Sequence, residues 1–295
     1  MVVRRKYHCN NEILEWQWAS DNEMMPHPYF TSVYLIDGLL IDSGAPEGVN
    51  DLRKFVQSLN PKQSINKCFI THTHEDHAGG AYMLKSEFGI PLYASEKAVR
   101  LLKKGNTYPK YRQMAWGPKL LPVIAEIIDK PIITKSEKYE FELFPMSGHA
   151  PELVALIEKN QQWAFVADAV LPKYKMIFGG NSDIQEDISL IYHSLSKLYD
   201  FTNGMDELLI FSAGNEVLKG REIILNKLEE IDNLRIKVHE IKTKFQKQGY
   251  FGKKLIKKIL RSIFGKESLI GKFTQGDLSR ENLIISLLKW KKEIR

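Results

Sequence analysis

The sequence predicts an α/β protein in which short apolar strands alternate with amphipathic helices. The 295-residue chain is 43% hydrophobic and 26% charged, a composition that supports a sizeable core and excludes disorder along the whole length. Apolar runs stay well short of the ~20 residues that a membrane-spanning helix needs. We therefore expect a layered globular fold without a membrane span.

The first half of the chain alternates between the two kinds of element. Asp37-Gly38 is a hairpin turn signal, Pro46 suits the first turn of a helix, and Gly89 suits the end of one. The expected elements are a hairpin of Tyr34–Ile36 and Leu39–Ile41, a helix from Pro46 to about Leu59, a strand Ile65–Thr71, a helix Gly79–Phe88, a strand Pro91–Ala94 and a helix from Ser95.

The second half begins with Gly105–Pro131, a stretch rich in Pro, Tyr and Trp. We expect this stretch to be irregular, with a helix near Val123–Ile128. Apolar runs then predict strands at Tyr139–Pro145, Leu153–Ile157, Trp163–Ala167 and Leu208–Phe211, with an amphipathic helix Asp183–Leu198 before the last strand. Beyond Gly220 the pattern is mostly helical.

One segment carries the candidate chemistry. Residues 71–80 have the sequence THTHEDHAGG, which places three histidines and an aspartate within six residues, directly after a buried strand. Neutral imidazoles and carboxylates are good ligands for zinc or iron. Because alternate residues at a strand end project to one side, we expect His72 and His74 to hold one ion. Asp76 and His77 follow in the turn and are expected at a neighbouring position.

This motif resembles the signature of the metallo-β-lactamase superfamily. The resemblance extends to three further places, which are the strand end Leu40–Gly44, the loop Pro145–Pro151 with the sequence PMSGHAP, and the strand end Phe165–Asp168. Their order and spacing fit the family over about residues 12–225. The resemblance implies a four-layer αβ/βα sandwich, with two mixed sheets inside helical layers and the metals at one sheet edge.

The resemblance also implies a ligand set. Site one would consist of His72, His74 and His149, site two of Asp76 and His77, and Asp168 would bridge both. The family closes site two with one more histidine, and Asn215 stands at that place in this chain. An amide oxygen is a weaker ligand than imidazole for zinc. Site two would then be weaker, hold a different metal, or recruit Glu216.

The expected cofactor is one or two zinc ions, with iron or manganese as alternatives. A metal lowers the pKa of bound water from 15.7 towards ~7 and so supplies hydroxide at neutral pH. We expect this hydroxide to attack an electrophilic carbonyl or phosphorus, with Asp76 as the catalytic residue that orients it. The sequence contains neither a Gly-x-Ser-x-Gly motif nor a Gly-x-x-x-x-Gly-Lys phosphate loop, which disfavours covalent serine catalysis and ATP use.

Charge is distributed unevenly along the chain. The formal net charge is +6, yet residues 235–295 carry 17 Lys and Arg against 5 Asp and Glu, and the preceding residues sum to −6. This split favours a catalytic domain over residues 1–225 and a basic helical C-terminal region over residues 226–295. Within the latter, Phe251–Phe264 has apolar residues at helical spacing and basic residues on the complementary face. Packing on the catalytic domain, contact with RNA or DNA, and contact with an anionic membrane all remain open for this helix.

The favoured function is hydrolysis of a small-molecule ester, thioester, lactone or lactam by a metal-dependent enzyme. One alternative is a phosphodiesterase or ribonuclease that uses the basic C-terminal region. Another is a mononuclear iron oxygenase acting on sulfur compounds, which the absent histidine leaves open. A metal-binding role without catalysis is disfavoured because five of six side-chain ligands are intact.

Partners and compartment follow from the same features. We expect a small-molecule substrate, with nucleic acid open as a second partner through the basic region. The chain has two cysteines and no N-terminal apolar stretch of the secretory kind, which favours the reducing cytoplasm. The sequence predicts no particular oligomeric state.

Overall fold

The structure is a computed structural model that describes residues 1–21, 29–171, 177, 179, 185–214 and 216–290. The chain divides into two compact units. The first, here called the sheet unit, comprises residues 1–146, 151–168 and 207–220. The second, the helical unit, comprises residues 147–150, 169–206 and 221–295.

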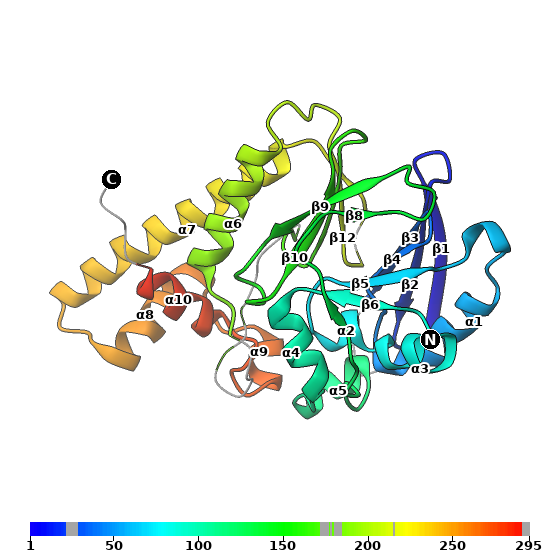
Figure 1. The fold of residues 1–295 in the computed structure, drawn as a ribbon. Coiled ribbons are helices and arrows are strands. Elements are labelled where there is room, and N and C mark those ends of the chain that lie inside the picture. Colours follow the sequence, from blue (N-terminus) through cyan, green and yellow to red (C-terminus); the bar gives the residue numbers. More distant parts are fainter. Residues whose placement is uncertain (22–28, 172–176, 178, 180–184, 215, 291–295) are drawn as a thin grey trace. The chain divides into compact units, whose positions relative to one another are not determined.

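The sheet unit contains two mixed β-sheets, so the α/β class is confirmed. The first sheet has the strand order β1-β2-β3-β4-β5-β6-β7 (Figure 1). Its strands are β1 (Val2–His8), β2 (Ile13–Ala19), β3 (Thr31–Ile36), β4 (Leu39–Ile41), β5 (Lys67–Ile70), β6 (Leu92–Ala94) and β7 (Glu126–Ile127). Strands β1 to β4 pair antiparallel, whereas β4 to β7 pair parallel. The carboxyl ends of β4 and β5 therefore meet at one edge of the sheet.

The second sheet has the order β13-β12-β11-β10-β9-β8. Its strands are β8 (Ile132–Ile133), β9 (Glu140–Pro145), β10 (Val154–Glu158), β11 (Trp163–Ala167), β12 (Leu209–Ser212) and β13 (Leu218–Lys219). Strands β11 and β12 pair parallel, and the other neighbours pair antiparallel. Both sheets are thus mixed, as expected.

One hydrophobic cluster joins the two sheets. It contains alternate residues of the first sheet, such as Tyr34 and Phe69, and of the second sheet, such as Phe165 and Phe211. The rings of Phe165 and Phe211 stack at 4.6 Å, and the Tyr34 hydroxyl donates to the carbonyl oxygen of Ser212 at 2.8 Å. Each such side chain contributes about 1.5–3 kcal/mol by leaving water, so this cluster fixes the sheets face to face.

Short helices of the sheet unit lie beside the first sheet (Figure 1). They are α1 (Val49–Gln57), α2 (Glu75–Ala78), α3 (Ala81–Phe88), α4 (Glu96–Lys104) and α5 (Lys110–Trp116), with 3₁₀ turns η1 (Pro46–Gly48) and η2 (Pro61–Gln63). Helix α1 buries Leu52 and Phe55, and the Phe55 ring lies 5.9 Å from that of Trp16 on β2. This contact buries the face of the first sheet that is turned away from the second.

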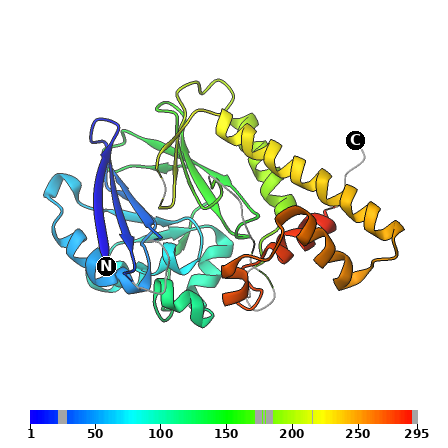
Figure 2. The ribbon, with the colours of Figure 1, turned by 180° about the vertical axis from the view of Figure 1, so that it is seen from behind.

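The helical unit consists of α6 (Ile188–Phe201), α7 (Glu222–Lys247), α8 (Gly252–Phe264), α9 (Leu269–Phe273) and α10 (Arg280–Lys289). Helices α6, α7, α8 and α10 pack against one another (Figure 2). Trp290 follows α10, and its ring lies 4.9 Å from that of Tyr192 on α6. The expected helical C-terminal region is therefore present, and α8 coincides with the amphipathic segment seen in the sequence.

The stretch Gly105–Pro131 is more ordered than expected. It contains α5, and the helix expected near Val123–Ile128 is wrong because β7 lies there and pairs parallel with β6. Isoleucines at 124, 127 and 128 favour an extended backbone. A short segment with this composition forms a strand when a neighbouring strand edge is available.

Two strands at the N-terminus were not predicted. Strand β1 is an exposed edge with the sequence VVRRKYH, which has no apolar alternation to detect. Strand β2 is buried throughout and includes Glu15, which accepts hydrogen bonds from Gln17 and Ser32 at 2.9 and 2.7 Å. Because buried polar residues interrupt the apolar pattern of this strand, its hydropathy does not reveal it.

Two predicted helices begin later than expected. The helix expected at Gly79–Phe88 begins at Ala81, after the single turn of α2. The helix expected at Asp183–Leu198 begins at Ile188, and residues 183 and 184 lie outside the described residues. The domain boundary expected at 225/226 lies within α7, and the assignment of a catalytic domain and a basic C-terminal region stays a prediction. Among the described residues, no helix is long and apolar enough to span a membrane.

Candidate metal centre

The histidine-rich segment forms a buried turn at the carboxyl end of β5. Residues 71–74 connect the strand to α2, which begins at Glu75, and His74 has an extended backbone. The side chains of His72, His74 and His77 are almost completely buried. Imidazoles and carboxylates cost free energy when they are buried without partners, so the arrangement needs contacts that satisfy them.

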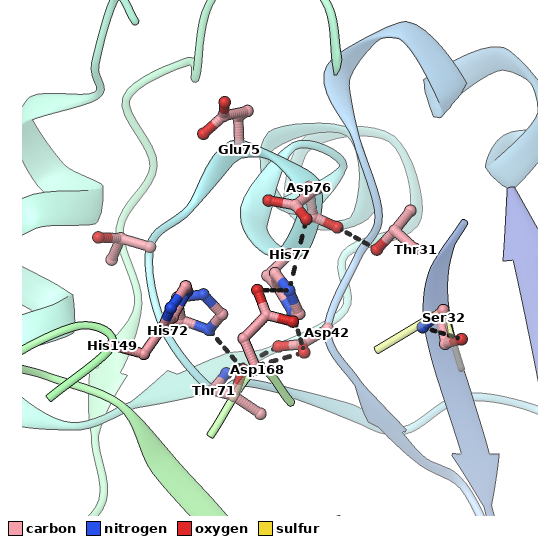
Figure 3. A network of polar contacts seen from close by, with 12 residues as sticks. Thr31, Ser32, Asp42, Thr71, His72, Glu75, Asp76, His77, His149 and Asp168 are labelled. Carbon is pink, nitrogen blue, oxygen red and sulfur yellow. Dashed lines mark hydrogen bonds and ion pairs between the residues drawn. The ribbon is translucent and has the colours of Figure 1, made fainter. Parts of the chain in front are cut away.

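Asp42 supplies the central contact of this turn (Figure 3). It follows β4, next to the end of β5, and its Oδ1 accepts a hydrogen bond from the backbone amide of Thr71 at 2.8 Å. Its Oδ2 lies 2.9 Å from the Thr71 hydroxyl and 2.7 Å from Nδ1 of His77. The Thr71 hydroxyl oxygen lies 3.1 Å from Nδ1 of His72. Asp42 thus orients His77 directly and His72 through Thr71.

This pattern of hydrogen bonds determines which ring nitrogens can bind an ion. Because Nδ1 of His77 donates to Asp42 and Nδ1 of His72 donates to Thr71, both rings keep Nε2 for another ligand. Nε2 of His77 is buried and makes no hydrogen bond with any described residue. A carboxylate that receives the remote N–H of an imidazole is the usual support of a metal-binding histidine.

Two glycines allow the turn to approach the neighbouring backbone. A Cβ on Gly79 would lie 2.2 Å from the nitrogen of Pro46, and one on Gly80 would lie 2.4 Å from the carbonyl oxygen of Ser43. The backbone amide of Ser43 in turn donates to the carbonyl oxygen of His77 at 2.7 Å. The residue pair that follows the histidines is therefore glycine for reasons of space, and the close approach holds His77 against Asp42.

Asp168 approaches the same place from the second sheet. It follows β11, where a register shift relative to β12 lies between Phe165 and Ala167, and Ala167 has a φ of 47°. Such a bulge redirects the residue that follows it. The Asp168 side chain keeps 17% of its surface exposed, and one of its oxygens lies 3.5 Å from Nε2 of His77.

Two groups of ligand atoms result within the sheet unit. His72, His74 and Asp168 each offer an atom, and these atoms lie within 4.8 Å of one another. Asp76, His77 and Asp168 form a second group, whose ligand atoms also lie within 4.8 Å of one another. Asp168 belongs to both groups, and the bridging role that the resemblance implies for it stays a prediction. The distances suit one or two cations, because each group could share an ion after small side-chain movements.

Electrostatics favour a cation at this place. Burial raises the pKa of Asp76, and the nearby charge of Asp168 raises it further. Burial would lower the pKa of His77, but the carboxylates of Asp42, Asp76 and Asp168 outweigh burial and raise it well above the usual value. Both pKa shifts arise because several negative charges lie close together in a buried space. A divalent cation would offset these charges, so the residues fit such an ion.

Two further contacts hold the turn, and neither was predicted. Arg112 on α5 donates to both carboxylate oxygens of Glu75, at 2.5 and 2.8 Å, and both side chains are buried. Burial raises the pKa of Glu75 although the Arg112 guanidinium opposes this shift. The Tyr108 hydroxyl donates to the carbonyl oxygen of Thr73 at 2.6 Å. The segment around α5 therefore holds the turn on both sides of His74.

Glu152 holds the turn from another direction. Its Oε1 accepts hydrogen bonds from the backbone amide and the hydroxyl of Thr73, at 3.1 and 2.7 Å. Thr73 lies between His72 and His74, so this contact fixes the spacing of the two rings. Glu152 follows the histidine loop in sequence, and that position was the one signal that could have drawn attention to it.

Two candidate ligands remain, His149 and Asn215. His149 lies in the helical unit, where its Nδ1 is 2.6 Å from Oε1 of Glu186, just before α6. The backbone amide of Asp187 also donates to the carbonyl oxygen of Gly148 at 2.9 Å, which fixes the loop to the start of α6. Asn215 lies outside the described residues. The metal-ligand roles of these residues therefore stay predictions.

A buried turn of histidines and aspartates lies at the strand ends of two mixed sheets, and its residues fit a divalent cation. The chain belongs to the metallo-β-lactamase superfamily, whose family model matches residues 27–189. The resemblance noted in the sequence is thereby confirmed.

Two curated relatives are similar to this chain. A hydroxyacylglutathione hydrolase, GloC, from Haemophilus influenzae is 27% identical over 109 residues, which are 36% of this chain and 50% of the relative. The match thus spans half the length of that relative. A probable metallo-hydrolase, YybB, from Bacillus subtilis is 21% identical over 195 residues, which are 64% of this chain and 81% of the relative.

Solved structures confirm the expected sandwich fold. A metallo-β-lactamase from Pontibacter korlensis superposes with a TM-score of 0.59 at 16% identity and covers 79% of this chain and 100% of its own. The enzyme FIM-1 from Pseudomonas aeruginosa, in a mono-zinc form, gives a TM-score of 0.58 at 14% identity, with 79% of this chain and 96% of its own covered. At these identities the likeness concerns the fold alone.

The first prediction concerns Asp42. Asp42→Asn keeps an oxygen for the Thr71 amide but turns an NH₂ group towards Nδ1 of His77, so the ring loses the tautomer that exposes Nε2. We expect zinc affinity to fall about 10–100-fold, as is typical for partners of metal-binding histidines. Competition with a chromophoric chelator measures this affinity. The matched control is Asp37→Asn in the β3–β4 turn, which should leave it unchanged.

The second prediction concerns the pair of Glu75 and Arg112. Arg112→Met leaves a buried carboxylate without its bidentate partner and should lower the free energy of unfolding by about 3–5 kcal/mol. Adding Glu75→Gln should recover part of this loss, because the buried charge is removed. Urea unfolding measures both.

The control for this pair is Arg53→Met. It breaks the bidentate pair of Arg53 with Glu87 on the surface, where the two side chains are 30% and 44% exposed. Its cost should stay below about 1 kcal/mol. Equal losses for Arg112→Met and Arg53→Met would contradict the role assigned to burial.

Proposed function

We propose that this metal-dependent hydrolase cleaves a small-molecule acyl substrate, such as an ester, thioester, lactone or lactam, and that zinc is its metal. The observation that carries the proposal is the pair of ligand groups that share Asp168, together with the support of His72 and His77 by Asp42. When bound, the ion supplies acidified water and a positive charge for a developing oxyanion.

His149 is proposed as the third imidazole of site one. Its loop, residues 147–150, is joined at both ends to the sheet unit, so chain connectivity keeps His149 two residues from Pro151. Glu186 would orient it, as Asp42 orients His77, by receiving the N–H of Nδ1.

Asp76 is proposed as the group that positions the attacking water and accepts its proton. Its carboxylate lies 3.6 Å from Nε2 of His77, and its side chain keeps 12% of its surface exposed. The backbone carbonyl of Asp76 accepts a hydrogen bond from Thr31, which fixes the start of α2. A buried carboxylate in a fixed position suits general-base work on a water molecule.

Thioesters are the subclass to test first. The relative from Haemophilus influenzae is named a hydroxyacylglutathione hydrolase, and such a substrate carries its acyl group on sulfur. In this reaction water adds to the acyl carbon, the carbon–sulfur bond breaks, and the thiol leaves with a proton. A panel of acyl-thiol, ester, lactone, lactam and phosphodiester substrates separates the subclasses. Turnover of the phosphodiester alone would overturn the proposal.

The third prediction separates metal binding from proton transfer. His74→Ala should lose both metal and turnover, because His74 is proposed as a direct ligand. Asp76→Ala should keep part of the metal but lower turnover by about 10²–10⁴-fold, the usual contribution of a positioned general base. Elemental analysis and steady-state kinetics measure the two effects. Asp129→Ala, which removes an exposed carboxylate, should change neither.

The fourth prediction concerns the number of ions. If Asn215 stands in place of a histidine, site two lacks one imidazole and should lose its ion first. Metal content after mild chelation should approach one ion per chain, and Asn215→His should raise it towards two. Losing a direct imidazole should cost more than the ~10–100-fold in affinity typical of groups that only support a ligand. Two equally tight ions in the unmodified protein would contradict this.

A further inference from the structure

Helix α8 of the helical unit carries a row of cations that form no ion pair with the described residues. Its sequence contains four lysines and one arginine and no acidic residue. Lys253, Lys254, Lys257 and Arg261 are exposed. Within the part of the chain that the structure describes, none of these four side chains forms an ion pair. They are here called the α8 row.

The opposite, apolar face of α8 is buried within the helical unit. Leu255, Ile259 and Leu260 are buried, and the helix packs against α7 and α10 within the helical unit (Figure 2). An amphipathic helix that binds a membrane inserts its apolar face into the lipid. Because Leu255, Ile259 and Leu260 are covered by their own unit, the exposed side chains of α8 are four cations and Ser262. This disfavours a lipid surface and favours an anion that binds by charge.

The spacing of the α8 row suits a chain of phosphates. Lys253, Lys257 and Arg261 recur every four residues, which places them about 6 Å apart along the helix axis. Such a row offers repeated charges rather than one pocket, so its counterpart is a polyanion with repeated charges. The net charge of +12 over residues 235–295 extends the same attraction beyond the helix.

An exposed aromatic side chain lies at the start of the row. Phe251 is the N-cap residue of α8 and is 63% exposed. Lys258, by contrast, lies over the Tyr250 ring at 4.8 Å and is partly buried. An exposed ring beside a cationic row is the combination by which proteins hold unpaired bases and their backbone.

We propose that the α8 row binds the phosphodiester backbone of a single-stranded nucleic acid, with Phe251 stacking on an unpaired base. This inference does not rest on the proposed hydrolase substrate, because it concerns a surface of the helical unit. The metal-free chain should therefore bind the nucleic acid as well as the metal-loaded chain does.

The test compares two triple variants of the full chain. Lys253→Gln, Lys254→Gln and Lys257→Gln together remove three charges from α8. The matched control removes three charges from exposed lysines of α4, by Lys97→Gln, Lys103→Gln and Lys104→Gln. Fluorescence anisotropy with a labelled single-stranded 20-nucleotide RNA is followed at several salt concentrations, and circular dichroism checks that each variant is folded.

The α8 variant should lower affinity at least about tenfold at low salt, and the slope of log K against log salt should become shallower by about 2, since each phosphate contact on a single strand contributes about 0.7. The α4 variant should leave the slope unchanged. Phe251→Ala should weaken RNA binding at least about fivefold without changing the weaker binding of duplex DNA.

Three results would overturn the proposal. The first is no RNA binding by the unmodified chain, and the second is an equal loss in both triple variants. The third is binding to phosphatidylserine vesicles through the α8 row in the absence of RNA binding, which would assign the surface to a membrane. An unchanged RNA affinity in Phe251→Ala would overturn the stacking role of the ring.

Discussion

The metal centre depends on one carboxylate, that of Asp42. It lies at the end of β4 with a φ of 65°, a conformation that aspartate tolerates better than most residues. From there it receives the Thr71 amide and the His77 ring, and it reaches His72 through the Thr71 hydroxyl. The parallel register of β4 and β5 places Asp42 beside Thr71. The pairing of β4 with β5 therefore determines the orientation of both imidazoles.

The same turn concentrates negative charge in a buried space. Asp76 and Asp168 raise the free energy of the folded chain by their mutual repulsion, and burial adds to it. A cation that binds only the folded chain offsets this repulsion and stabilises the fold by mass action. Metal binding and stability should therefore be linked in this protein. The buried pair of Glu75 and Arg112 limits the excess charge, because it neutralises one carboxylate within the turn itself.

The residue pattern alone predicted the part of the candidate site that is local in the chain, and the family resemblance added the distant Asp168 and His149. Thr71 to Gly80 are contiguous, so a strand end followed by a turn brings His72, His74, Asp76 and His77 together. Arg112 and Glu152 were missed because their partners lie 37 and 79 residues away, and nothing in a local pattern selects one arginine or glutamate among many. The same reason explains β7, whose strand form depends on the free edge of β6 rather than on its own periodicity.

The contacts of α5 have a consequence for how this protein can change over evolution. Tyr108 and Arg112 bind the ligand turn from a segment with few other regular elements, and such segments usually vary most freely among related enzymes. Here that freedom is restricted, because insertions or deletions near α5 would displace the turn between His72 and Asp76. New substrate preferences should therefore arise through single side-chain replacements in this segment, with its length and its two anchoring residues kept.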